Sequence, residues 1–223
     1  YWQDDTLCRN PTSYLELDSL PPRGRSLADN ERYYREGGQA GFETRRGCDM
    51  RCTYCADPVS KGRSVRLRSP KLVVDELRTL LDQGIDHFHT CDCEFNVPGE
   101  HAEAICREII SQGLGEKIKW FAYCSVMPFD EEMADLFVRA GCAGVDFGVD
   151  SGSDELLAGL GRNFRREHVI RTASLCHEHG ITFMYDLLLG GPGETKETVR
   201  DTIELMRQSL LSRESGGFVS THT

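Results

Sequence analysis

Short apolar runs alternate with amphipathic stretches along most of this chain. The apolar runs have the length of buried strands, and they cover residues 42–45, 87–90, 118–126, 145–149 and 182–189. Between them, apolar residues recur every three or four positions, which is typical of helices with one buried face. The last of these helices is expected to bury a stripe formed by Val199, Ile203, Met206 and Leu210.

Start and stop signals delimit the predicted helices. Pro70, preceded by Ser69, suits the first turn of one helix, and Asp130 suits the beginning of another. Glycines that favour helix ends follow at Gly84, Gly113, Gly141 and Gly180. The alternation predicts an α/β fold of parallel strands with right-handed crossovers, as a barrel or an open doubly wound sheet. In either arrangement, ligands bind at the carboxyl ends of the strands.

The chain divides into two regions of different composition. Residues 1–40 are rich in proline, glycine, aspartate and arginine, which is typical of a linker or arm from a preceding domain. Residues 41–223 form the predicted core. The first residue is Tyr1 rather than methionine, and residues 216–223 resemble the start of another strand. We therefore expect the sequence to continue at both ends and the core to be incomplete at its final strand.

Charge and hydropathy narrow the class of protein. A formal net charge of -10 and an isoelectric point near 5.2 argue against the broad basic surface that binds nucleic acid. No stretch approaches the ~20 apolar residues that span a membrane, so we expect a cytoplasmic protein without a membrane partner. In a reducing compartment, metal or cluster ligation explains the clustered cysteines better than disulfides do.

Three cysteines occur in one short loop directly after the first predicted strand. Cys48, Cys52 and Cys55 are separated by three and two residues. Three thiolates leave one iron of a [4Fe-4S] cluster open to bind a small molecule, whereas a structural zinc ion needs four protein ligands. Cys91 or Cys93 from the next strand end could complete a zinc site, and three unrelated thiols are a further alternative.

The order Cys-x-x-x-Cys-x-aromatic-Cys after a first strand resembles the radical S-adenosylmethionine (SAM) superfamily, with Tyr54 as the aromatic residue. The resemblance implies a partial parallel (βα) barrel. It also implies that Cys48, Cys52 and Cys55 hold a [4Fe-4S] cluster whose open iron takes the amino and carboxylate groups of SAM. An electron supplied by an external donor would then cleave SAM to a 5′-deoxyadenosyl radical.

Later segments extend the resemblance, and each lies at a predicted strand end. Asp92 or Glu94 stands where the family contacts the SAM amino group. Asp150 and Ser151 lie in a segment that resembles the ribose-binding part of the family. Asp150 replaces the glutamate that often occurs there, which shortens the side chain by one methylene. The resemblance therefore favours Ser151 over Asp150 as the ribose contact.

Two further segments complete the expected SAM site. Arg162 could pair with the SAM carboxylate, because a guanidinium group matches a carboxylate in a two-pronged contact. Gly190, Gly191 and Glu194 lie in a glycine-rich turn that resembles the segment near the adenine. Tyr54 of the cysteine motif is included among the expected cofactor-binding residues.

Residues next to these motifs resemble those of one group within the superfamily. Cys55-Ala-Asp57-Pro58, residues 91–96 and Met127-Pro128-Phe129 are similar to cobalamin (B12)-binding radical SAM proteins of the tryptophan 2-C-methyltransferase-like branch. This resemblance implies methyl transfer from SAM through cobalamin to an unactivated carbon of a small-molecule or peptide substrate. Cobalamin would be bound by a domain outside this sequence.

Two other functions are considered. A methylthiotransferase-like radical SAM enzyme that modifies RNA or protein shares the Asp-Ser-Gly segment at 150–152 and the Gly-x-Pro-Gly-Glu-Thr segment at 190–195. The acidic charge and the absence of a second cysteine set before Cys48 weigh against that class. A non-catalytic zinc or redox module is the other alternative.

Overall fold

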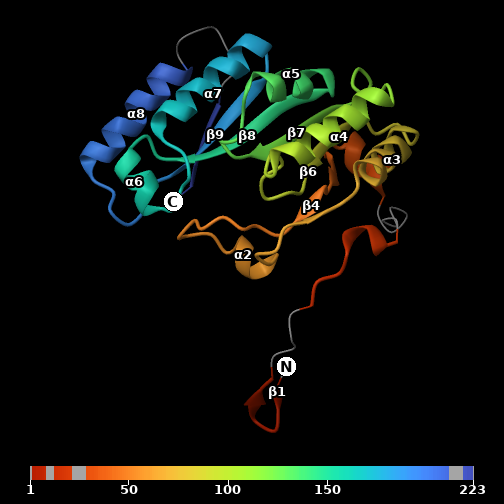
Figure 1. Cartoon of the computed structure of the whole chain (residues 1–223), viewed down its shortest axis with the longest axis horizontal. Helices are drawn as coiled ribbons and strands as arrows, with labels where there is room; N and C mark the ends of the chain where they lie inside the picture. The colour runs from red at the N-terminus through yellow and green to blue at the C-terminus, as the bar shows by residue number, and fades with distance from the viewer. Residues whose placement is uncertain (1, 9–12, 22–28, 211–217, 223) are drawn as a thin grey trace.

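The computed structural model describes residues 2–8, 13–21, 29–210 and 218–222. Its main body contains a six-stranded sheet whose neighbouring strands are all parallel (Figure 1). The strands, in spatial order, are β10 (Phe218–His222), β9 (Thr182–Leu188), β8 (Cys142–Asp150), β7 (Lys119–Cys124), β6 (His87–Thr90) and β3 (Ala40–Phe42). The predicted α/β fold with parallel strands is therefore confirmed.

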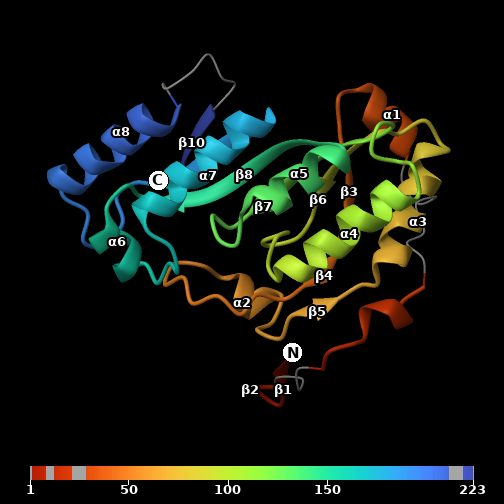
Figure 2. The same cartoon turned by 45° about the horizontal axis from the view of Figure 1, so that its top comes forward.

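Helices cover one face of this sheet (Figures 1 and 2). They are α3 (Pro70–Leu81), α4 (Gly99–Ser111), α5 (Glu131–Arg139), α7 (Arg166–His179) and α8 (Lys196–Leu210). Large side chains from the strands, among them Phe88, Trp120 and Phe147, are fully buried in one core with apolar residues of the helices. Because side chains alternate along a strand, the other face presents partly exposed polar residues such as His89 and Asp146.

The first predicted strand divides into two short elements. β3 ends at Phe42, and β4 (Arg45–Arg46) instead pairs antiparallel with β5 (Arg66–Leu67). The cause is the buried carboxylate of Asp92, directly after β6. It accepts hydrogen bonds from the backbone amides of Thr44 and Arg45, at 2.9 and 3.0 Å, and from the Thr44 hydroxyl at 2.7 Å. These bonds turn the chain away from the sheet at Thr44.

Most other predicted boundaries agree with the structure. Asp130 caps α5 by accepting from the Met133 amide at 2.9 Å, and Gly180 ends α7 in the left-handed conformation. β10 confirms the strand expected near the end of the sequence, whereas Gly216, Gly217 and Thr223 lie outside the described residues.

The predicted buried stripe of α8 is wrong in part. Ile203 is 48% exposed, and the side of the helix that packs inward contains Thr202, Leu205 and Ser209. Polar side chains can be buried on the inward side because they form hydrogen bonds there. The Thr202 hydroxyl oxygen, for example, accepts a hydrogen bond from the Gly152 amide at 2.9 Å.

The predicted arm contains short elements that the sequence did not indicate. β1 (Trp2–Gln3) and β2 (Thr6–Leu7) form an antiparallel hairpin, and a 3-10 helix (Leu17–Ser19) and α1 (Asn30–Arg35) follow. The hairpin lies apart from the sheet and its helices (Figure 1). The assignment of residues 1–40 to a linker stays a prediction. None of the described helices is long and apolar enough to cross a membrane.

We expect Asp92→Asn to destabilise the fold by about 1–3 kcal/mol, because an amide NH₂ would replace one oxygen that accepts buried hydrogen bonds. Urea denaturation followed by circular dichroism measures this loss. Asp82→Asn, at an exposed aspartate on the end of α3, is the matched control and should change stability by less than about 0.5 kcal/mol. Equal stability of the two variants would contradict the role given to Asp92.

The pair formed by His89 and Asp146 predicts a pH-dependent stability. His89 Nε2 lies 3.5 Å from Asp146 Oδ2, and chiefly this contact raises the pKa of His89, against the effect of burial. A histidine whose pKa is higher in the folded state than in the unfolded state stabilises the fold at pH values below its unfolded-state pKa. This stabilisation is lost as the pH rises through the folded-state pKa. Asp146→Asn should therefore lower the free energy of unfolding by about 0.5–1 kcal/mol near pH 5.5 and by less near pH 9. Urea titrations at both pH values test this, and equal losses would contradict it.

Candidate functional site

The three motif cysteines lie in the long loop between β4 and β5, which also contains the short helix α2 (Asp57–Ser60). This loop, drawn in orange, crosses the end of the sheet near the C label in Figure 1. Gly47 begins it with a φ of +97°, and a Cβ there would meet the Ser64 carbonyl oxygen at 2.2 Å. Only glycine fits this position. The Cys48 amide then donates to the Gly62 carbonyl at 2.9 Å, so the loop folds back on itself.

The far part of the loop is attached to a neighbouring helix. The Thr53 amide donates to the Leu160 carbonyl at 3.0 Å, where α6 (Asp154–Gly159) ends. Gly161 follows with a φ of +78°, and a Cβ there would meet the Arg51 carbonyl oxygen at 2.5 Å. The cysteines are therefore positioned by close backbone contacts on both sides of the motif.

Side chains from this loop and from the strand ends enclose a cavity of about 110 Å³. Its lining includes Cys48, Cys52, Cys55, Tyr54, Cys93, Glu94 and Arg162. Residues predicted from three separate segments of the sequence are thus brought together. Among the described residues, no three His, Cys, Asp or Glu side chains form a group that could hold a metal ion on their own.

Two of the motif sulfurs accept hydrogen bonds from nitrogen. Arg162 donates from Nη1 to the Cys52 sulfur at 3.1 Å, and the Asp57 amide donates to the Cys55 sulfur at 3.4 Å. Burial raises the pKa of Cys52, and the positive charge of Arg162 opposes this effect. The thiolate is the form that binds iron, and the Arg162 guanidinium favours it at Cys52 against the larger effect of burial.

The third motif sulfur has a thiol as its neighbour. Cys48 lines the cavity together with Cys93, which lies on the loop after β6. Interaction between the two side chains lowers the pKa of Cys48 and raises the pKa of Cys93. From the sequence, Cys93 was expected only as an alternative zinc ligand, and the structure brings it to the cavity.

Glu94 provides a carboxylate to the cavity. Its side chain is half-buried and forms no hydrogen bond or ion pair with the residues that the structure describes. Burial raises its pKa to about 7, although the positive charges of Arg162 and Arg45 act in the opposite direction. An unpaired carboxylate beside the cysteines fits a ligand that carries an ammonium group, as SAM does.

Tyr54, Asp150 and Arg162 form one connected group at the edge of the cavity. Asp150 has a φ of +62°, an uncommon conformation that aspartate tolerates better than most residues. Its carboxylate lies 3.3 Å from Arg162 Nε and accepts from the Tyr54 hydroxyl at 2.9 and 2.8 Å. Burial, followed by the charge of Asp150, raises the pKa of Tyr54. The expected ribose contact at Asp150 is therefore a carboxylate already held by two neighbours.

Arg162 is buried, with only 3% of its side chain exposed. It pairs with Asp150, donates to the Gly148 carbonyl, and lies over the Phe164 ring with 4.8 Å between the guanidinium carbon and the ring centroid. Among the described residues, none accepts a hydrogen bond from its Nε, which lies 3.3 Å from the Asp150 carboxylate. A ligand carboxylate that reached Arg162 would therefore share the guanidinium with Asp150.

Asp92 and Ser151 are among the expected contact residues that do not line the cysteine cavity. Asp92 is 4% exposed and is engaged by Thr44 and Arg45. Ser151 is 1% exposed, and its hydroxyl lies 3.3 Å from that of Thr202 on α8. Each of these residues holds elements of the fold together, and their expected contacts with SAM stay predictions.

The glycine-rich turn forms a second hollow, of about 540 Å³. It is lined by Gly190, Gly191, Glu194, Thr195, Lys196, Val199 and Arg200. Glu194 closes the turn by accepting from the Gly190 amide at 2.7 Å. Gly190, with a φ of +78°, is one position where a left-handed backbone is required.

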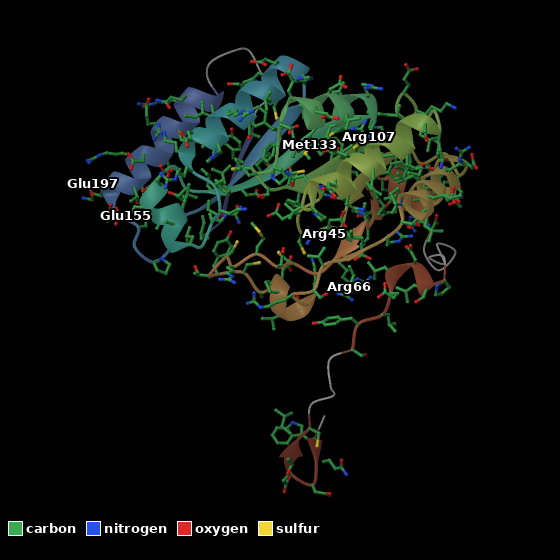
Figure 3. All side chains as sticks on the ribbon, in the orientation of Figure 1. Arg45, Arg66, Arg107, Met133, Glu155 and Glu197 are labelled. Carbon is green, nitrogen blue, oxygen red and sulfur yellow. The ribbon has the colours of Figure 1, made fainter. Side chains whose placement is uncertain are left out.

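Arg45 is a site residue that sequence reasoning missed. It is 2% exposed, and its guanidinium donates to the Glu94 carbonyl at 3.2 Å and to the Gly47 carbonyl. Figure 3 shows Arg45 and Arg66, which come from β4 and β5. A charged residue inside a predicted apolar strand was the available signal, because a buried arginine needs partners at a strand end.

Comparisons with known proteins agree with this geometry. The Radical SAM superfamily matches residues 42–206. Tryptophan 2-C-methyltransferase from Streptomyces laurentii is 38% identical over 192 residues, which cover 81% of this chain and 32% of that protein. A tRNA-2-methylthio-N(6)-dimethylallyladenosine synthase from Moorella thermoacetica is 29% identical over 199 residues, which cover 82% of this chain and 43% of that protein.

Solved structures give the same result. TsrM from Kitasatospora setae, a radical SAM methyltransferase with cobalamin and a [4Fe-4S] cluster bound, has a TM-score of 0.79 and 36% identity, covering 93% of this chain and 40% of that chain. Its structure with tryptophan and a SAM analogue has a TM-score of 0.76, 38% identity and coverages of 86% and 37%. This chain spans 32% to 43% of the lengths of the relatives named here. Because the family match includes the motif cysteines and most of the parallel sheet, the chain belongs to the radical SAM superfamily and has its partial barrel fold.

Proposed function

We propose that this chain is the cluster-binding and SAM-binding part of a cobalamin-dependent methyltransferase that acts on an unactivated carbon. The observation that carries the proposal is the convergence of three cysteines, a half-buried acid and a buried arginine on one cavity. The similarity to tryptophan 2-C-methyltransferase and to TsrM supports the methyl-transfer chemistry. The lower identity to the methylthio-forming synthase, 29% against 38%, makes that class the weaker candidate.

In this proposal Cys48, Cys52 and Cys55 hold a [4Fe-4S] cluster and leave one iron open. Glu94 takes the SAM amino group, and Arg162 takes the SAM carboxylate. The bound cluster and cobalamin would supply electron transfer to SAM and carriage of the methyl group. The role of the chain is to orient SAM and to hold the three cysteines beside it, which the donors at Cys52 and Cys55 and the buried position of Arg162 support.

The rest of SAM would lie along the strand ends. We place the ribose near Ser151 and Asp150 and the adenine against the turn that contains Gly190, Gly191 and Glu194. The open hollow of about 540 Å³ at that turn supports this placement, because close backbone approach suits a flat ring. Asp92 would act indirectly, by fixing the loop from which Cys48 projects.

We further propose a small-molecule or peptide substrate, an external electron donor and a cytoplasmic setting. TsrM has been solved with tryptophan as its substrate, which supports an aromatic amino acid or related compound as the first class to test. A reducing compartment suits cysteines that must stay reduced to hold a cluster.

Removal of one motif thiolate should abolish the cluster. After anaerobic reconstitution, we expect wild type to hold about four irons per chain, and Cys52→Ala and Cys55→Ala to hold less than about one. Because Cys93 lines the same cavity as Cys48, that position is tested with the double variant Cys48→Ala, Cys93→Ala. Cys106→Ala, in the buried face of α4, should keep its iron. Full iron in Cys52→Ala would exclude the proposed cluster site.

Loss of the Glu94 charge should weaken SAM binding. Glu94→Gln keeps the size of the side chain but removes a charge-assisted hydrogen bond worth about 1.5–3 kcal/mol, so Kd should rise by about tenfold or more. Anaerobic calorimetry with the reconstituted protein measures Kd. The melting temperature should not fall, because Gln avoids the burial of a charge. Glu155→Gln, at an exposed position on α6, is the control, and equal Kd values for all three proteins would contradict this role.

A further inference from the structure

The segment 13–21 of the predicted arm is attached to the core. Leu17, in the 3-10 helix, is only 3% exposed. The Asp18 carboxylate accepts a hydrogen bond from the Ser69 amide at 2.8 Å, directly before α3 begins. Negative charge is favourable at this end of a helix. Leu17 and Asp18 therefore fix this segment, and Tyr14 precedes them by only a few residues.

Tyr14 contacts the part of the cysteine loop that returns to β5. The Arg66 guanidinium carbon lies 4.6 Å from the centroid of the Tyr14 ring, and Arg66 is labelled in Figure 3. A Cβ added to Gly62 would lie 2.6 Å from a carbon of the same ring, so the ring packs against the Gly62 backbone. Arg66 also donates to the Lys61 carbonyl at 2.7 Å. Tyr14 and Arg66 therefore hold the backbone of two consecutive loop residues.

Gly62 connects this contact to the cysteine motif. Its carbonyl oxygen accepts a hydrogen bond from the Cys48 amide at 2.9 Å. Gly62 is therefore in contact with both the Tyr14 ring and the Cys48 backbone. The other end of the motif is attached differently, through the Thr53 amide and the Leu160 carbonyl. Of the motif cysteines, Cys48 is thus the one joined to the arm through a single intervening residue.

We propose that Tyr14 is a positioning residue that holds the Cys48 end of the cysteine loop in place and thereby slows the loss of the cluster. The inference rests on the proposed function, since it requires a cluster on the three motif cysteines. A bound thiolate leaves its iron more readily when its backbone can open locally, so restraint of the loop should slow the release of iron. The Tyr14 ring provides this restraint, because its hydroxyl has no hydrogen-bond partner among the residues that the structure describes.

The first test measures iron release from the reconstituted chain. Tyr14→Ala should reach the iron content of wild type and then lose iron to a chelator about two to five times faster, the factor expected from one exposed cation–π contact. Tyr14→Phe keeps the ring and should behave as wild type does. Tyr33→Ala is the matched control, because the Tyr33 ring is also exposed and also packs against a glycine, Gly38, that lies outside the loop.

A second test uses the chain without its cluster. Hydrogen exchange followed by mass spectrometry should show faster exchange of the Cys48 amide in Tyr14→Ala. The melting temperature should not change, because Tyr14 is 48% exposed. Arg66→Met should also speed the release of iron from the reconstituted chain. The double variant should release iron more slowly than the product of the two single effects predicts, because the two side chains form one contact.

Iron release at the wild-type rate in Tyr14→Ala would overturn the inference and leave the proposed function intact. Faster release in Tyr14→Phe would also overturn it, because the ring would then not be the restraint. So would a lower melting temperature with faster exchange throughout the chain, because Tyr14 would then stabilise the whole fold. If wild type itself holds no [4Fe-4S] cluster, the proposed function fails, whereas exchange of the Cys48 amide still decides whether Tyr14 restrains the loop.

Discussion

The buried carboxylate of Asp92 fixes the relation between the sheet and the cysteine loop. Its two oxygens accept from two consecutive backbone amides and one hydroxyl, all at the point where the chain leaves β3. Without these acceptors, the amides of Thr44 and Arg45 would be buried without partners, which is costly. The contact between Tyr54 and Asp150 depends on that turn, because it joins the loop to the end of β8.

Charge balance gives the cavity its chemical character. The buried guanidinium of Arg162 is balanced by Asp150, and its remaining donors are directed at a carbonyl and a cysteine sulfur. Arg45 is held by two carbonyl groups rather than by a carboxylate. Glu94 has positive charge nearby but no direct partner among the described side chains. The cavity lining therefore contains both a carboxylate and a guanidinium, which are the two groups that complement a zwitterionic ligand.

The sequence predicted the fold and the motif cysteines because both leave local signals. Strand and helix periodicity and glycine stops appear within short windows, and the spacing of Cys48, Cys52 and Cys55 is local as well. The roles of Asp92, Ser151 and Arg45 could not be predicted, because each depends on partners distant in sequence. From the sequence, Asp92 and Glu94 were equal candidates because both follow the same strand. In the structure, Asp92 accepts hydrogen bonds from the backbone, and Glu94 lines the cavity.

The close attachment of the cysteine loop has a consequence for assembly of the site. The loop is fastened through Cys48 to Gly62 and through Thr53 to Leu160, and Gly47 and Gly161 allow backbone approaches that other residues would block. The backbone of these residues therefore loses most of its conformational entropy during folding. Little more of this entropy would be lost when iron and sulfide bind. A bound cluster would therefore find the backbone of the loop already ordered, and it would mainly have to draw the three sulfurs together.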